Sequence, residues 1–153
     1  MDSNLQAFLT TIAVSEGTYN QGRRNGYDIL VGSTPSRVRR FNDFDRHPNC
    51  TMQVTDEIWS SAAGRYQIIY PTWVGLQKRL NLPDFSPASQ DRAAIELITD
   101  AAALELVQKG DLRTAIEKCA KIWASFPGAG YGQRENTPAY LIAAYRKAGG
   151  KLL

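Results

Sequence analysis

The sequence predicts an α+β fold in which several helices surround a small antiparallel β region. Two patterns carry this prediction. Apolar residues recur at helical spacing near the N-terminus and again from residue 71 onward, whereas residues 18–62 are rich in Gly, Pro, Asn and Asp. With 153 residues, 43% of them hydrophobic, the chain has the size of one globular domain with a hydrophobic core. We therefore expect a single, mostly helical domain over residues 1–153, with a cleft between its helical and β lobes.

The first expected element is a helix over residues 3–15. Ser3 and Gln6 fit a capping box, and apolar residues follow at the spacing of one helical face: Leu5, Phe8, Leu9, Ile12 and Ala13. Gly17 is expected to end this helix, because glycine readily adopts the left-handed conformation of a helix end. In the next region, the β-prone segments 27–31 and 51–54 predict a small sheet or hairpin.

Helical signals return after residue 70 and continue to the end of the chain. Four start signals are present: Pro71, Ser89, Asp111, and Thr137 with Pro138. The second of these helices is expected to be long and to end near residue 110, and the last to end at residue 149. Cys119 and Trp123 lie on the apolar stripe of the third helix, which predicts core positions for both. The segment FPGAGYG, residues 126–132, is too glycine-rich for regular structure.

Charge and cysteine content exclude several classes of protein. A net charge of +3 is too weak to argue for nucleic acid, but it is compatible with an anionic polymer as partner. Cys50 and Cys119 form neither a disulfide scaffold nor a CxxC pattern. The N-terminal segment lacks the features of a secretory signal, and no run of about 18 apolar residues is present. We therefore expect synthesis in the cytoplasm without stable membrane insertion.

The segment IAVSEGT, residues 12–18, places one carboxylate at the end of the first helix. Glu16 follows Ile12 by four residues and Ala13 by three, so helical geometry carries it along the buried face. Burial and the negative end of the helix dipole would both raise its pKa, as a general acid requires. The alternative is a side chain that bends out to solvent, and position alone favours that alternative.

Other acidic residues are weaker candidates. A second catalytic carboxylate would be sought among Asp28, Asp43, Asp45 and Asp56. Asp28 is the best of them because it lies in the β region, although the preferred interpretation is that it orders a loop. Asp43, Asp45 and His47 have spacing that suggests a metal site, but a solvated loop is the favoured interpretation because no further ligands accompany them. We expect no metal and no cofactor.

Three separated motifs, SEG at 15–17, AAGRYQI at 62–68 and SFPGAGYG at 125–132, resemble those of the lysozyme and lytic transglycosylase superfamily. The closer resemblance is to the endolysin family of bacteriophage lambda. It is carried by SEGT, GYDILVG, AGRYQ, DFSPASQD, KGDLRTAIEKC, IWASFPGAGYGQ and KAGG. This likeness extends from about residue 7 to residue 150, in order and without large gaps.

The resemblance implies a lysozyme-like fold and a monomeric enzyme that acts on peptidoglycan glycan strands. It implies cleavage between N-acetylmuramic acid and N-acetylglucosamine with formation of a 1,6-anhydro ring, and Glu16 matches the catalytic glutamate. One carboxylate suffices if the C6 hydroxyl of the sugar is the nucleophile, because the same group then serves as acid and as base. A hydrolytic muramidase is the alternative, and a non-catalytic peptidoglycan-binding protein is a third. The resemblance also implies access to the wall through a membrane lesion made by a holin-type protein.

The resemblance assigns further residues to the substrate cleft. Gln67 is expected to hydrogen-bond near the scissile sugar, and Tyr131, with its neighbour Gly130, to form a wall or donate a hydrogen bond. Tyr66 and Ser61 are candidates for substrate contact, but Tyr66 could instead be core and Ser61 could instead hold the turn before residue 64. Asn25 and Asn136 stand where the lambda relative carries histidine, so any role of those histidines is in doubt here.

Overall fold

The computed structural model describes residues 1–153 and contains six helices and one two-stranded sheet. The elements are α1 (Ser3–Glu16), β1 (Met52–Gln53), β2 (Trp59–Ser60), α2 (Tyr70–Leu80), α3 (Pro87–Asp100), α4 (Leu104–Lys109), α5 (Leu112–Cys119) and α6 (Pro138–Lys147). The residues form two compact units: unit 1 is Met1–Glu16 with Ile95–Leu153, and unit 2 is Gly17–Ala94. The single domain therefore stays a prediction. None of the helices has the length and apolarity needed to span a bilayer.

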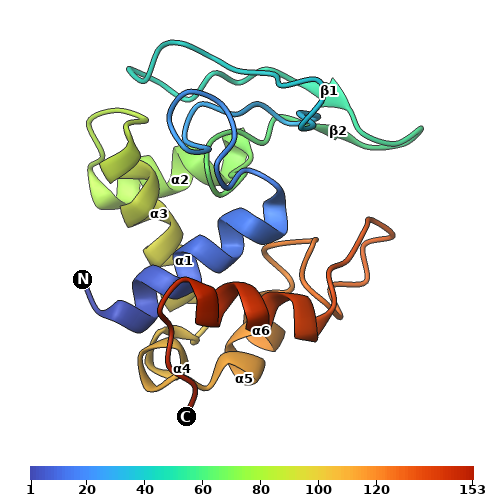
Figure 1. Ribbon diagram of the computed structural model, residues 1–153. Coiled ribbons are helices and arrows are strands. Elements are labelled where there is room, and N and C mark those ends of the chain that lie inside the picture. Colours follow the sequence, from blue (N-terminus) through green and yellow to red (C-terminus); the bar gives the residue numbers. More distant parts are fainter. The chain divides into compact units, whose positions relative to one another are not determined.

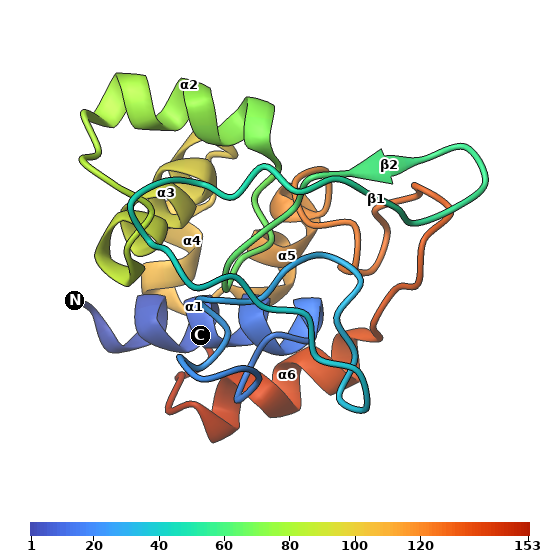
Figure 2. The same cartoon turned by 90° about the horizontal axis from the view of Figure 1, so that it is seen from above.

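Unit 1 combines the two ends of the chain. Helix α1 packs against α6 and α4, and α4 packs against α5 (Figures 1 and 2). The buried face of α1 contributes Phe8, whose ring meets that of Phe126 edge-on at 6.2 Å between centroids. Cys119 and Trp123 are also buried, as their helical spacing predicts. This packing fixes the last turn of α1 from several sides.

The residues that end α1 and cap α6 are those that the sequence predicts, but the residue that caps the start of α1 is not. Asp2 rather than Ser3 caps α1, because its carboxylate accepts a hydrogen bond from the Leu5 amide at 3.0 Å. Gly17 follows α1 with φ of 77°, the left-handed conformation that glycine adopts without strain. Thr137 caps α6 as predicted, since its hydroxyl accepts from the Tyr140 amide at 3.2 Å.

The prediction of one long helix ending near residue 110 is wrong. The structure has two helices, α3 and α4, and the chain breaks between them at Ala102, whose φ is 56°. The amides of Ala102 and Ala103 bond back to the carbonyls of Thr99 and Ile98, at 2.9 and 3.0 Å. The chain therefore turns in a left-handed residue where no glycine marks the turn. The start of the helix also differs from the prediction. Helix α3 begins at Pro87, two residues before the predicted cap, Ser89.

Unit 2 contains the small β region. Strands β1 and β2 pair antiparallel, with Met52 opposite Ser60 (Figure 1). The β-prone segment 27–31 forms no strand and instead makes isolated bridges, Ile29 with Arg40 and Leu30 with Ala63. Helix α2 presents Trp73 to the interior, where its ring meets that of Phe85 at 4.7 Å.

Candidate active site

Glu16 is the last residue of α1, and its side chain is partly buried. Burial raises the pKa of the Glu16 carboxyl from 4.5 to about 8, because a low-dielectric surrounding disfavours the ionised form. A hydrogen bond with the Ser125 side chain acts in the opposite sense and lowers the pKa. The raised pKa agrees with a buried Glu16 rather than with a side chain that bends out to solvent, and burial is its main cause. The carboxyl group is protonated at neutral pH.

Three polar side chains surround the end of α1. The hydroxyls of Ser15 and Ser125 lie 2.7 Å apart, and the Asn136 side-chain amide donates to the Ser15 hydroxyl at 3.0 Å. The same amide donates to the Ser15 carbonyl at 3.0 Å, and the Asn136 backbone amide donates to the Ser125 carbonyl at 2.7 Å. Sequence reasoning missed Ser15 and Ser125, because these contacts join segments about 110 residues apart.

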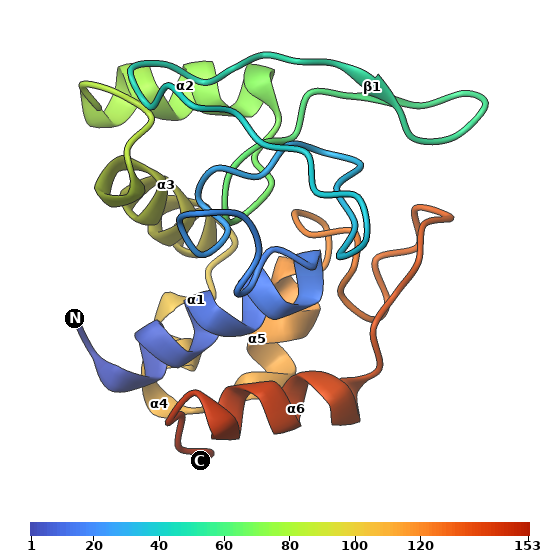
Figure 3. The same ribbon diagram turned by 45° about the horizontal axis from the view of Figure 1, so that its top comes forward.

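The glycine-rich segment between Ser125 and Asn136 forms an ordered loop beside the end of α1 (Figure 3). Glu135 holds it, since one carboxylate oxygen accepts from the Gly128 amide at 2.9 Å and the other from the Gly130 amide at 3.1 Å. These two donors, Gly130 first, hold the pKa of Glu135 below its usual value. Tyr131 donates its hydroxyl to the Lys121 carbonyl at 2.8 Å, while 51% of the residue stays exposed. Its ring is therefore available as a surface.

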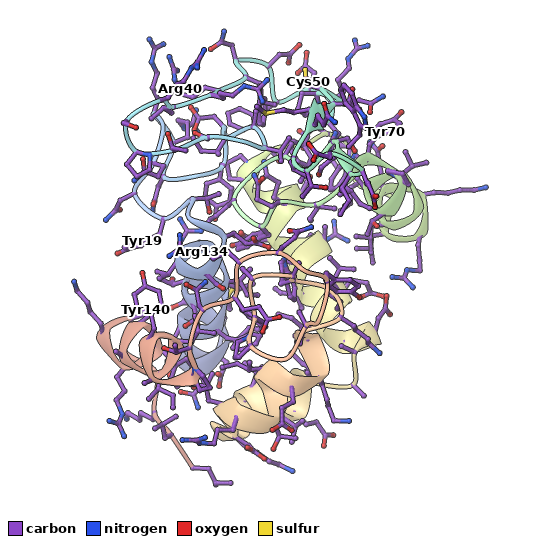
Figure 4. The ribbon with its side chains drawn as sticks, turned by 90° about the vertical axis from the view of Figure 1, so that its right-hand side faces the viewer. Tyr19, Arg40, Cys50, Tyr70, Arg134 and Tyr140 are labelled. Atoms are coloured by element: carbon purple, nitrogen blue, oxygen red, sulfur yellow. The ribbon has the colours of Figure 1, made fainter.

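Helix α6 follows this loop directly, with Arg134 on the loop and Tyr140 on the first turn of the helix (Figure 4). Tyr140 is exposed, at 52% of its surface. Unit 1 thus brings Glu16 together with both ends of the loop that carries Gly130 and Tyr131. The remaining predicted site residues belong to unit 2.

In unit 2, Gln67 lies on a tight turn that begins at Gly64. Its side-chain amide donates to the Gly64 carbonyl at 2.9 Å and to the Ile29 carbonyl at 3.4 Å, and its φ is 49°. Gly64 has φ of 83°, and a Cβ there would lie 2.2 Å from the Gln90 side-chain oxygen. Only glycine fits this turn, which accounts for the Gly-x-x-Gln pattern in the sequence. The partly buried Gln67 is held by the turn itself.

Asp28 is 2% exposed, and its contacts favour the loop-ordering interpretation. One carboxylate oxygen accepts from the Arg23 amide at 3.1 Å and lies 3.9 Å from the Arg40 guanidinium. The other carboxylate oxygen is buried without a hydrogen-bond partner. The contacts of the first oxygen link Asp28 to Arg23 and Arg40.

Tyr66 and Ser61 also take structural positions. Tyr66 is 2% exposed and donates its hydroxyl to Asp91 at 2.6 Å, next to the Tyr27 hydroxyl, which donates to the same oxygen at 2.8 Å. The Ser61 hydroxyl accepts from the Tyr70 amide at 2.9 Å, at the start of α2. The burial of Tyr66 favours its core alternative over contact with substrate, whereas the Ser61 hydroxyl bonds to the start of α2 and not to the turn before residue 64.

The prediction of a solvated loop over residues 43–47 is correct for the aspartates and wrong for the histidine. Asp43 and Asp45 are exposed, whereas His47 is buried beside the ring of Phe85, 4.7 Å between centroids. The Asn49 amide donates to Nδ1 of His47 at 3.0 Å, so Nε2 carries the proton and donates to the Ile68 carbonyl at 2.8 Å. Burial lowers the pKa of His47, and the ring is neutral. No group of three or more His, Cys, Asp or Glu side chains is arranged to hold a metal ion.

Comparison with known proteins gives full-length matches. A family model described as Endolysin matches residues 6–152. The endolysin of Escherichia phage lambda is 42% identical over 153 residues, covering 98% of this chain and 94% of that protein. The endolysin of Escherichia phage P2 is 44% identical over 154 residues, covering 96% of this chain and 93% of that protein.

Solved structures match equally well. Bacteriophage lambda lysozyme complexed with a chitohexasaccharide matches with a TM-score of 0.93 and 41% identity, over 100% of this chain and 98% of that one. Another structure of the lysozyme from bacteriophage lambda gives a TM-score of 0.90 and 40% identity, with the same coverage. The predicted lysozyme-like α+β fold is confirmed.

Proposed function

Because the chain belongs to the endolysin family, the phage proteins that lyse bacterial cell walls, we propose that it is a lytic transglycosylase acting on peptidoglycan. The bond cleaved is the β-1,4 linkage between N-acetylmuramic acid and N-acetylglucosamine, and the product carries a 1,6-anhydro ring. The hexasaccharide in the complex of the lambda lysozyme supports a glycan as substrate. The observation that carries the proposal is the protonated carboxyl of Glu16 at the end of α1.

Glu16 serves first as acid and then as base. With a pKa of about 8, its carboxyl carries a proton at neutral pH and donates it to the glycosidic oxygen as the C1–O4 bond breaks. The resulting carboxylate then accepts the proton of the C6 hydroxyl as O6 bonds to C1. The proton returns to Glu16, no water is consumed, and the enzyme is restored. Because the nucleophile belongs to the substrate, no second carboxylate is needed to hold a water molecule.

The state of Asp28 supports this one-carboxylate chemistry. The candidate second carboxylate is 2% exposed; one of its oxygens is engaged by the Arg23 amide and Arg40, and the other is buried without a hydrogen-bond partner, so neither oxygen is open to a substrate. We propose Gln67 as the amide that contacts the substrate's polar groups and Tyr131, next to Gly130, as an exposed aromatic wall for a sugar ring.

The decisive experiment is digestion of purified sacculi, followed by mass spectrometry of the released muropeptides. We expect anhydro-muramic ends from the wild-type protein and no release from Glu16→Gln, which keeps the side-chain size but cannot donate a carboxyl proton. Reducing ends, heavier by one water, would identify a hydrolytic muramidase. Undiminished release by the Glu16→Gln variant would refute the assignment of Glu16, and binding without release by the wild type would indicate a non-catalytic binding protein.

Access to the wall follows from the same proposal. The protein acts as a monomer on glycan strands in the periplasm after a holin-type protein has permeabilised the membrane. Expression in bacteria with and without such a membrane-permeabilising protein tests this dependence, and lysis without it would contradict the proposed route.

A further inference from the structure

Around Glu16, side-chain hydrogen bonds of unit 1 link Asn136, Ser15 and Ser125. The side-chain nitrogen of Asn136 carries hydrogens and can only donate, so the Ser15 hydroxyl is the acceptor in their 3.0 Å contact. The hydroxyls of Ser15 and Ser125 lie 2.7 Å apart, and by distance alone either of them can be the donor. Ser125 in turn shares a side-chain hydrogen bond with Glu16. An ionised carboxylate can only accept, so when Glu16 is ionised Ser125 donates its proton to Glu16 and accepts from Ser15.

We propose that Asn136, Ser15 and Ser125 form a one-way hydrogen-bond chain that ends as a proton donor to ionised Glu16 and positions its carboxylate during the reaction. This inference rests on the proposed role of Glu16 as acid and base. Ser15, Ser125 and Asn136 are positioning residues, because they act through Glu16. Asn136 favours this direction, since its nitrogen can only donate to Ser15, whereas an oxygen in its place would accept the Ser15 proton.

The surroundings of the chain make such a donor effective. Ser15 is 8% exposed, so its hydroxyl is largely removed from competing water. In a site of low dielectric, a hydrogen bond to an ionised group is stronger than one in water. The Asn136 amide also holds the Ser15 carbonyl at 3.0 Å, and its backbone amide holds the Ser125 carbonyl at 2.7 Å. The two serines are therefore fixed at their backbones as well as at their hydroxyls.

The donor is most useful after the first proton transfer. At that stage Glu16 is an ionised carboxylate in a buried surrounding, which is the costly state of the cycle. The Ser125 hydroxyl stabilises that state and keeps one carboxylate oxygen engaged, leaving the other for the C6 hydroxyl of the sugar. Loss of the donor should therefore raise the pKa of Glu16 and slow turnover, with little effect on substrate binding.

Charged groups near Glu16 do not account for its raised pKa. On the elements that pack against α1, and on the loop that carries Asn136, they are Glu105, Lys109, Arg146, Lys147, Arg134 and Glu135. Glu105 pairs with Lys109 at 3.8 Å, and Glu135 is held by two loop amides. The influences on the pKa of Glu16 are burial, first, and the Ser125 hydroxyl. Ser125 is therefore the group whose removal should move it.

The test measures the pH profile of turnover on purified sacculi for Ser125→Ala, Asn136→Asp and Ser125→Thr, with thermal unfolding recorded for each. Activity falls at alkaline pH when Glu16 loses its proton. We expect this alkaline fall in activity to move upward by about 0.5 to 1 pH unit in Ser125→Ala, which corresponds to one hydrogen bond to an ionised group. In Asn136→Asp it should move in the same direction, because the new negative charge adds to the loss of the donor. We also expect kcat to fall about tenfold while KM changes less than twofold. Ser125→Thr keeps the hydroxyl and should keep the alkaline fall of the wild type.

The control is Ser3→Ala, which removes an exposed hydroxyl from the other end of α1 and should leave the alkaline side of the pH–activity profile unchanged. If a variant unfolds, Ser15→Ala breaks the same chain one bond earlier and is measured in its place. A folded Ser125→Ala variant with an unmoved alkaline fall, or a Ser125→Thr variant that shifts as alanine does, would overturn the inference. An active Glu16→Gln variant would instead overturn the proposed function, so the two failures are distinguishable.

Discussion

The buried carboxyl of Glu16 should cost the protein stability, and Glu16→Gln should recover it in a pH-dependent manner. The pKa of this group is raised from 4.5 in the unfolded chain to about 8 in the folded protein. Between these values the unfolded chain has lost the proton that the folded protein retains. The folded state binds more protons, so stability falls as pH rises through this window. The neutral amide of glutamine does not titrate, so Glu16→Gln does not lose folding stability in this way.

The magnitude follows from the shift. One pKa unit corresponds to about 1.4 kcal/mol, so the shift of Glu16 amounts to about 5 kcal/mol above pH 8, about 3 kcal/mol near pH 7 and almost nothing at about pH 4. Glutamine brings its own packing changes, but those are independent of pH. The quantity to measure is therefore the change with pH of the stability difference between the two proteins.

Urea unfolding at several pH values between about 4 and 8 measures this difference. We expect Glu16→Gln to gain stability relative to the wild type as pH rises, and to gain none at the acidic end. Glu117→Gln is the matched control, because it removes an exposed glutamate from α5 in the same unit. Parallel pH dependences of Glu16→Gln and the wild type would refute the assignment of a protonated, buried carboxyl to Glu16.

Three further outcomes are expected. His47 is buried as the neutral ring with a lowered pKa, so stability should decline as pH falls below about 6.5, and thermal unfolding of His47→Gln should lack that decline. Ala102 adopts φ of 56°, so Ala102→Gly should stabilise by about 0.5 to 1 kcal/mol in chemical unfolding, and a loss would contradict the strain. Cys50 is exposed (Figure 4) whereas burial raises the pKa of Cys119 to about 12, so a thiol reagent should label one cysteine in the folded protein and two after unfolding.

Local signals in the sequence were sufficient for most elements of the fold. Periodicity and caps predicted α1, α2, α5 and α6, because an amphipathic stripe and its end residues are local properties of a segment. The break at Ala102 could not be predicted in this way. Its neighbours are alanines, which favour helix, and the turn there follows from packing that overrides propensity. The burial of His47 likewise depends on Phe85 and Trp73, which are distant in sequence.

The residues of the candidate site also differ in how far the sequence predicts them. Helical spacing places Glu16 on the buried face, but position alone favours a solvent-facing side chain, and the resemblance of the later motifs is what singles out Glu16. The Gly64 turn is predicted by its Gly-x-x-Gln spacing. Tyr66 and Ser61 were ambiguous because an aromatic or hydroxyl residue serves equally well in a core, at a cap or at a sugar. The contact between the hydroxyls of Ser15 and Ser125 could not be predicted from the sequence, since no spacing rule links residues 110 positions apart.

The loop over residues 126–135 acts on Glu16 through its ends. Ser125 precedes the loop and Asn136 follows it, and both bond to Ser15 in the last turn of α1. Glu135 closes the loop on the Gly128 and Gly130 amides, which keeps the two ends in register. Burial pushes the pKa of Glu16 up and the Ser125 donor pulls it down, so the loop supplies the opposing influence that leaves the value near 8. A carboxyl group with that pKa is protonated before cleavage, and its ionised form is still stable enough to accept a proton afterwards.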